Sequence, residues 1–232
     1  MKKKVLLLML STIGPYVLWA QNNCSKFYPM EEGTSYQYTM YNKKDKPDGT
    51  IDYLVSEVNS SGGETYATMQ LKFEDEKGKN VMQTDYNITC TGNGVKIDFE
   101  SLFPAQMRSQ YENMGMEMDI TGTDIQLPND LSVGQSLEDA HMNVSMDTGV
   151  MKMKVDIETT DRKVEAKESL TTSAGTFDCY LITEKNRSKV MMANQEFSNK
   201  VWLAEGVGMV KQESYNKSGK LMGRMELTKF SR

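Results

Sequence analysis

The sequence predicts an all-β protein with one short helix, in which an antiparallel meander of about eleven strands forms a curved sheet or open barrel. Two observations support this fold class. Apolar and polar residues alternate with the period of two that half-buried strands require, and clusters of Gly, Asn and Asp separate the alternating segments. One segment instead has helical spacing, and we expect it to pack on the concave side of the sheet.

The N-terminal segment has the pattern of a cleaved export signal. Lys2 to Lys4 precede the apolar run Val5–Ile13, and Ala20 is a small residue suited to cleavage. The run is shorter than the roughly 20 residues that a membrane-spanning helix needs. We therefore expect residues 1–20 to be a signal peptide and residues 21–232 to form a single β-rich domain without a membrane span. The protein is then expected in the periplasm, in the cell envelope or outside the cell.

The charge and the motifs exclude several function classes. The chain has 27 basic and 32 acidic residues, and loss of the three signal-peptide lysines leaves a net charge of −8. An acidic chain without a basic stripe is not expected to bind nucleic acid. His141 is the single histidine, and no metalloprotease motif, nucleophile elbow or phosphate loop is present. We therefore expect a protein that is not an enzyme, with no cofactor and no metal among its expected site residues.

The expected strands follow from alternation such as that of Tyr36, Tyr38 and Met40, which share one face of the first segment. Turns rich in Gly, Asn and Asp bound most of the segments. The expectation of about eleven strands rests on twelve candidate segments with approximate bounds, which in chain order are Thr34–Tyr41, Ile51–Val58, Thr65–Phe73, Val81–Cys90, Val95–Phe99, Leu137–Met146, Val150–Glu158, Lys163–Thr171, Cys179–Met191, Phe197–Leu203, Val207–Tyr215 and Lys220–Phe230.

The expected helix spans Ser101–Met114. Its apolar residues Phe103, Met107, Tyr111 and Met114 follow each other at helical spacing and form one stripe. Because no second helix is expected, the stripe should face the concave side of the sheet. The helix would then either fill the barrel mouth as a plug or cover a hydrophobic pocket as a movable lid.

Three cysteines follow the export signal, so a disulfide is chemically allowed. Cys24 lies just inside the mature chain, and Cys90 ends a strand before a glycine-containing turn. A Cys24–Cys90 bridge would attach the N-terminus to the sheet, and we expect it to contribute on the order of 3–4 kcal/mol. Cys179 shares a strand face with apolar neighbours and is expected to be a buried free thiol.

Many of the 19 methionines follow each other with strand periodicity, including Met116 and Met118 after the expected helix. Methionine side chains can fill a core, line a cavity for an irregular apolar ligand, or bind Cu(I) through their thioethers. We expect a core or cavity lining. The expected ligand cavity is lined by Phe103, Met107, Tyr111, Met114, Met116 and Met118.

Four segments of the mature chain resemble the TapB family, which comprises uncharacterised exported proteins of Bacteroidota-type bacteria. These segments are Asn23–Pro29 (NCSKFYP), Leu131–Gln135 (LSVGQ), Thr171–Tyr180 (TTSAGTFDCY) and Val201–Lys211 (VWLAEGVGMVK). Ser173 departs from the pattern, in which proline is expected. TapB is similar to a broader domain-of-unknown-function group of periplasmic β-proteins. The resemblance implies a curved antiparallel sheet or open barrel and supplies no catalytic residues.

These observations favour an exported, non-enzymatic envelope protein. Its expected partner is an apolar small molecule or an envelope protein, bound through the cavity lined by methionine and aromatic residues. Two alternatives stay open at this stage. The chain could be a structural or adhesion module with a solid core and no ligand, or a Cu(I)-handling protein that uses its methionine clusters.

Overall fold

The computed structural model describes residues 24–97, 117–147, 149, 152–190 and 193–232. In these ranges the chain forms one antiparallel sheet of 13 strands, in the order β6-β8-β9-β10-β11-β12-β13-β1-β2-β3-β4-β5-β7. The described residues contain no helix, and the helix expected at Ser101–Met114 lies outside them. The all-β antiparallel fold is confirmed for the described part, whereas the expectation of about eleven strands is too low.

Most neighbouring strands in the sheet also follow each other in the chain, as the meander prediction requires. The strands are β1 Ser35–Asn42, β2 Pro47–Ser61, β3 Glu64–Asp75, β4 Asn80–Cys90, β5 Gly94–Ile97, β6 Glu117–Thr123, β7 Ile125–Pro128, β8 Ala140–Asp147, β9 Lys152–Thr172, β10 Gly175–Val190, β11 Ala193–Ala204, β12 Gly208–Asn216 and β13 Leu221–Ser231.

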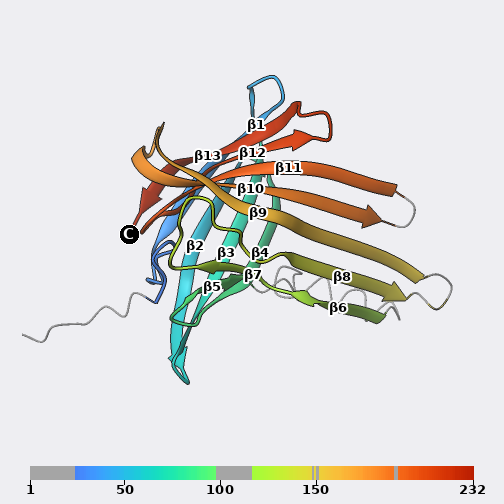
Figure 1. Ribbon diagram of the computed structural model, residues 1–232, viewed down its shortest axis with the longest axis horizontal. Coiled ribbons are helices and arrows are strands. Elements are labelled where there is room, and N and C mark those ends of the chain that lie inside the picture. The colour runs from blue at the N-terminus through green and yellow to red at the C-terminus, as the bar shows by residue number, and fades with distance from the viewer. Residues whose placement is uncertain (1–23, 98–116, 148, 150–151, 191–192) are drawn as a thin grey trace, which may run out of the picture.

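The two strands that the sequence analysis missed bring the ends of the sheet together. β6 and β7 stand at opposite ends of the strand order, yet only Asp124 separates them in the chain. β6 pairs with β8, whereas β7 pairs with β5. The sheet therefore curls into a nearly closed barrel. Figure 1 shows its two halves, with the blue and teal strands β1–β5 crossed at a wide angle by the yellow and orange strands β8–β11.

Neither of these strands has a long alternating pattern. β7 has four residues and ends at Pro128, which cannot donate a ladder hydrogen bond. β6 contains Gly122, which weakens a strand prediction. Glycine is required there, because a Cβ atom on Gly122 would lie 2.1 Å from the carbonyl oxygen of His141 on β8. The residue that obscures the pattern therefore allows the close approach of two strands.

β9 is one long strand, where the sequence analysis expected two strands separated at residues 159–162. The interruption is a β-bulge, at which Asp161 and Arg162 together stand opposite Glu184 of β10. Asp161 has a φ of 53°, in the left-handed region that Asp tolerates better than most residues. Bulges redirect side chains, and here the Arg162 side chain is buried, with 4% of its surface exposed.

The interior is rich in tyrosine. Tyr36 and Tyr38 stack on β1, and Tyr38 packs edge-on against Tyr53 of β2, which contacts Tyr86 of β4 in the same way. The Tyr38 hydroxyl donates a hydrogen bond to the carbonyl oxygen of Met209 at 2.7 Å. A second apolar cluster joins the N-terminal segment, the residues before β8 and strands β9 to β11, and consists of Phe27, Leu131, Leu137, Val164, Ile182 and Leu203.

Burial raises the pKa of Tyr53 to about 12. A tyrosine with a raised pKa stabilises the fold fully below its unfolded pKa near 10, and this contribution is lost as pH rises through the folded value. Between about pH 10 and pH 12, Tyr53 should therefore lower the free energy of unfolding of the wild type by about 1.4 kcal/mol per pH unit. Tyr53→Phe should abolish this contribution to the loss. Urea unfolding across this interval, compared with wild type, measures the difference. An alkaline slope equal to that of wild type would contradict the prediction.

Candidate functional site

Of the six residues of the predicted ligand cavity, one lies among the described residues. Phe103, Met107, Tyr111, Met114 and Met116 lie outside the described residues, so a cavity lined by them stays a prediction.

Met118, the remaining member of the predicted set, lies on β6. It is half-buried, and it stands opposite Met146 of β8 in the strand register. Met118 therefore belongs to the sheet, next to another methionine.

The predicted disulfide is present, with 5.9 Å between the Cα atoms of Cys24 and Cys90. Cys90 is fully buried, so the bridge attaches the N-terminal segment to the core of the sheet. Cys179 is a buried free cysteine, as expected. Burial raises the pKa of the Cys179 thiol to about 11, which keeps it protonated and unreactive at neutral pH.

Asn129 holds the same region together through its side-chain amide. Its Oδ1 accepts a hydrogen bond from the backbone N–H of Lys26 at 2.8 Å. Its Nδ2 donates to the carbonyl oxygens of Cys24, at 2.8 Å, and Gly92, at 3.1 Å. The amide therefore links the N-terminus to the turn after β4. The sequence analysis missed this role, because residues about 100 positions apart in the chain meet only in the fold.

The described residues form an open hollow of about 700 Å³ across β13, β1, β2, β3 and β4. The side chains at its floor alternate along each strand with core residues such as Tyr36 and Tyr53, and therefore point away from the tyrosine core. We call this hollow the polar groove and define it by two registered rows. One row is Lys229, Gln37, Asp52, Lys72 and Gln83, and the other is Ser231, Ser35, Leu54 and Gln70.

The two rows of the polar groove offer mainly amides, hydroxyls and paired charges, and apolar residues between these positions, Tyr36, Tyr53, Leu71 and Phe230, also line the hollow. Gln37 Nε2 donates to Asp52 Oδ1 at 2.8 Å, and Lys72 forms an ion pair with Glu74 at 2.6 Å. Within the two rows Leu54 is the exception, an apolar side chain with 38% of its surface exposed. The sequence shows these residues only as the polar faces of separate strands. Their assembly depends on the register, which alternation does not specify across a whole sheet.

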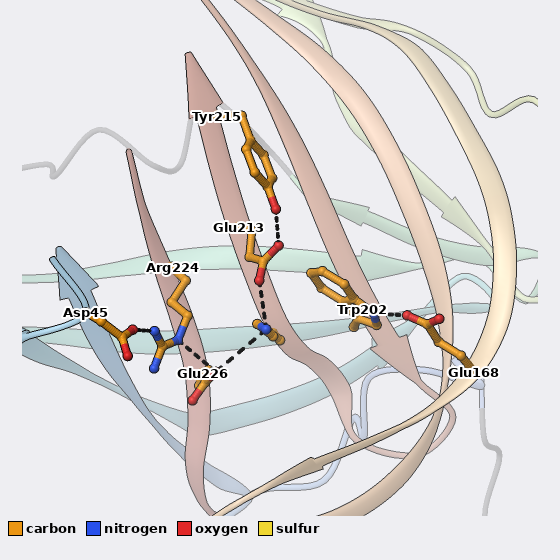
Figure 2. Close-up of polar contacts among 8 residues, drawn as sticks. Asp45, Glu168, Trp202, Glu213, Tyr215, Arg224 and Glu226 are labelled. Carbon is orange, nitrogen blue, oxygen red and sulfur yellow. Dashed lines mark hydrogen bonds and ion pairs between the residues drawn. The ribbon is translucent and has the colours of Figure 1, made fainter. Parts of the chain in front are cut away.

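A second candidate is a row of charged side chains that crosses β12 and β13 (Figure 2). Lys211 Nζ lies 2.8 Å from Glu213 Oε1 and 3.8 Å from Glu226 Oε1. Arg224 Nε donates to Glu226 at 2.9 Å, and the Arg224 guanidinium also pairs with Asp45 in the turn after β1. Each charge in the row therefore has an opposite charge beside it.

Two aromatic residues extend this network (Figure 2). Trp202 Nε1 donates to Glu168 Oε1 at 2.6 Å, and the Tyr215 hydroxyl donates to Glu213. Burial alone would raise the pKa of Glu213, but hydrogen bonds from Lys211 and Tyr215 outweigh it and lower that pKa. Glu213 is thus held as a paired anion, which suits a structural role better than proton transfer.

A second hollow, of about 520 Å³, lies over β9, β10 and β11 and is lined by further ion pairs. Arg187 lies 3.4 Å from both Glu158 and Glu196, and Lys185 lies 2.8 Å from Asp161. In the described ranges no group of three or more His, Cys, Asp or Glu side chains is arranged to hold a metal ion. The same ranges contain no helix that is long and apolar enough to cross a membrane.

Comparison with known proteins identifies the family. The model of the DUF3108-like family matches residues 31–227, which is most of the chain. The chain belongs to the DUF3108-like family. This membership agrees with the broad group of domains of unknown function that the sequence resemblance implied. No curated protein matches the sequence.

Two solved structures show the fold of this DUF3108-like chain. One is a proposed exported protein with a YmcC-like fold from Bacteroides fragilis NCTC 9343, with a TM-score of 0.70 and 18% identity over 90% of this chain and 100% of the other. The second is a proposed lipoprotein from Parabacteroides distasonis ATCC 8503, with a TM-score of 0.71 and 23% identity over 89% of this chain and 99% of the other. At these identities the likeness concerns the fold alone.

Proposed function

We propose that this DUF3108-like chain is an exported, non-enzymatic protein of the cell envelope that binds a protein partner through the polar groove. The basic and apolar pattern before Ala20 supports export. The names of the two similar structures, one an exported protein and the other a lipoprotein, agree with it. The bridge to Cys90 occupies the Cys24 sulfur, which argues against a lipid on that residue.

The open shape of the polar groove and the amides in its two rows favour a protein partner over a small molecule. Small-molecule sites are enclosed clefts or cavities, whereas this groove is open and extends over five strands. Protein interfaces combine a few exposed apolar residues with a polar surround, as Leu54 and its neighbours do. The amides of Gln37, Gln70 and Gln83 each donate and accept hydrogen bonds, so they can pair with the backbone of a partner.

The proposal that the chain is not an enzyme rests on the state of its charged groups. The half-buried carboxylates Glu213 and Glu226 are engaged by Lys211 and Arg224. The buried thiol of Cys179 is held in its protonated form. A general base or nucleophile needs an accessible group with a suitable pKa, and these groups do not provide one.

Several narrower expectations accompany this proposal. Membership of the TapB family and a Bacteroidota source stay predictions, and so does a location in the periplasm, in the cell envelope or outside the cell. An apolar ligand bound by Phe103 to Met118 also stays a prediction, because only Met118 of that set is described.

Site-specific photo-cross-linking in the native envelope tests the proposed interface. A photoreactive residue at Leu54 should give one discrete adduct with a protein. The same residue at Met222, which is 52% exposed on β13 and lies outside the polar groove, should not give that adduct. Gln37→Arg places a bulky charge in the groove and should remove the Leu54 adduct. Identical adducts from both positions, or no adduct from Leu54, would overturn the proposal.

A further inference from the structure

Three methionines from three adjacent strands meet in one row of the sheet. Met118 of β6 stands opposite Met146 of β8, and Met146 stands opposite Met153 of β9. Residues paired in this way share one face of the sheet. Only the strand register reveals this arrangement, because the three residues come from separate segments of the chain.

The surroundings of this methionine row are apolar. The next row on the same face is Ile120, Val144 and Val155, and the row beyond it is Gly122, Met142 and Ile157. Val144 and Met142 are buried, whereas the three methionines of the row are half-buried. The thioethers therefore lie where an apolar face meets solvent.

The choice of methionine is not explained by strand formation. Strands favour β-branched and aromatic residues, and the adjacent row follows this preference with Ile120, Val144 and Val155. In the methionine row every position has a flexible side chain with a sulfur atom. What this row has in common is therefore its thioether chemistry.

The dimensions of a sheet allow the three sulfur atoms to converge. Neighbouring strands are about 4.8 Å apart, so the backbones of β6 and β9 are about 10 Å apart on either side of β8. Methionine has three rotatable bonds, and the outer side chains can lean towards Met146. Soft thioether sulfur selects soft ions such as Cu(I), and carboxylate or carbonyl oxygen suits hard ions.

We propose that Met118, Met146 and Met153 form a Cu(I)-binding site of three thioether ligands. The site binds the ion in its reduced state and needs no electron transfer. It is separate from the polar groove, so it does not depend on the proposed protein partner.

Titration of the mature chain with Ag(I) tests this site. Ag(I) has the charge and sulfur preference of Cu(I) and is stable in air. We expect one Ag(I) ion to bind and to shift the methyl resonances of three methionines in an NMR spectrum. Single variants identify those resonances. Met146→Leu removes the central sulfur at nearly constant volume and should weaken binding on the order of tenfold or more.

Met142→Leu is the matched control. Met142 lies on the same strand and the same face as Met146, but its register partners Gly122 and Ile157 contain no sulfur. Ag(I) affinity should be unchanged in this variant. Circular dichroism establishes that both variants fold. Cu(I), titrated without oxygen against a chromophoric chelator, should rank the variants in the same order.

Three results would each overturn the proposed site. The first is wild-type protein that does not bind Ag(I). The second is an equal loss of affinity in Met142→Leu and Met146→Leu. The third is undiminished binding by the combined variant Met118→Leu, Met146→Leu and Met153→Leu, which would place the ion at other sulfur atoms of the chain.

Discussion

Arg162→Ala is expected to lower the free energy of unfolding by about 3–5 kcal/mol. Arg162 Nη1 donates to the carbonyl oxygens of Gln126 on β7, at 3.0 Å, and Glu138, at 2.8 Å. Its Nε lies 3.7 Å from the Glu184 carboxylate, and only 4% of the arginine side chain is exposed. The substitution would leave two carbonyl oxygens and a largely buried carboxylate without their cation.

Arg187→Ala on β10 is the matched control for this loss. Arg187 also pairs with glutamates, at 3.4 Å from Glu158 and Glu196, but 57% of its side chain is exposed. Exposed ion pairs contribute little, so this variant should lose less than about 1 kcal/mol. Urea unfolding of both variants measures the difference. Equal losses would contradict a special role for Arg162.

A second comparison separates the charge of Arg162 from its volume. Arg162→Met fills much of the same space but leaves Glu184 without its buried cation. Adding Glu184→Leu should restore part of the stability, because an apolar pair avoids the cost of a buried unpaired charge. If the double variant is no more stable than Arg162→Met, the packing of the side chain dominates and the ion pair does not.

Local sequence patterns predict the individual strands of this protein better than they predict the closure of the sheet into a barrel. Alternation such as Tyr36, Tyr38 and Met40 reports one strand at a time, and most of the predicted segments are strands in the structure. The hydrogen bonds by which Arg162 helps to close the barrel depend on a bulge at Asp161, where the sequence analysis expects a break between two strands. They also depend on β7, which is too short to show a pattern.

Local sequence patterns do not predict the candidate sites either, because each site is assembled from several strands. The polar groove assembles Gln37, Gln70 and Gln83 from three strands, and the methionine row assembles Met118, Met146 and Met153 from three others. Each residue taken alone looks like an ordinary solvent-facing or core position. A shift of one residue in register would move a side chain to the opposite face, so sequence periodicity cannot place these groups together.

Reduction of the Cys24–Cys90 bridge should lower the free energy of unfolding by about 4 kcal/mol, and this is the second large effect that we expect. The two cysteines are 66 positions apart, so the bridge closes a long loop and restricts the unfolded chain strongly. In the folded chain it also holds the N-terminal segment, where Phe27 is 1% exposed within the second apolar cluster. Urea unfolding with and without a thiol reductant measures the loss.

Two variants assign this loss to the bridge. Cys24→Ala combined with Cys90→Ala should be destabilised like the reduced wild type and should no longer respond to the reductant. Cys179→Ala removes the buried free thiol but keeps the bridge, so its stability should still fall on reduction. Hydrogen bonds from Asn129 to Cys24 and Gly92 remain when the bridge is open. If these bonds alone hold the N-terminus, reduction will change the stability by much less than the loop estimate, and the bridge will not be the main attachment.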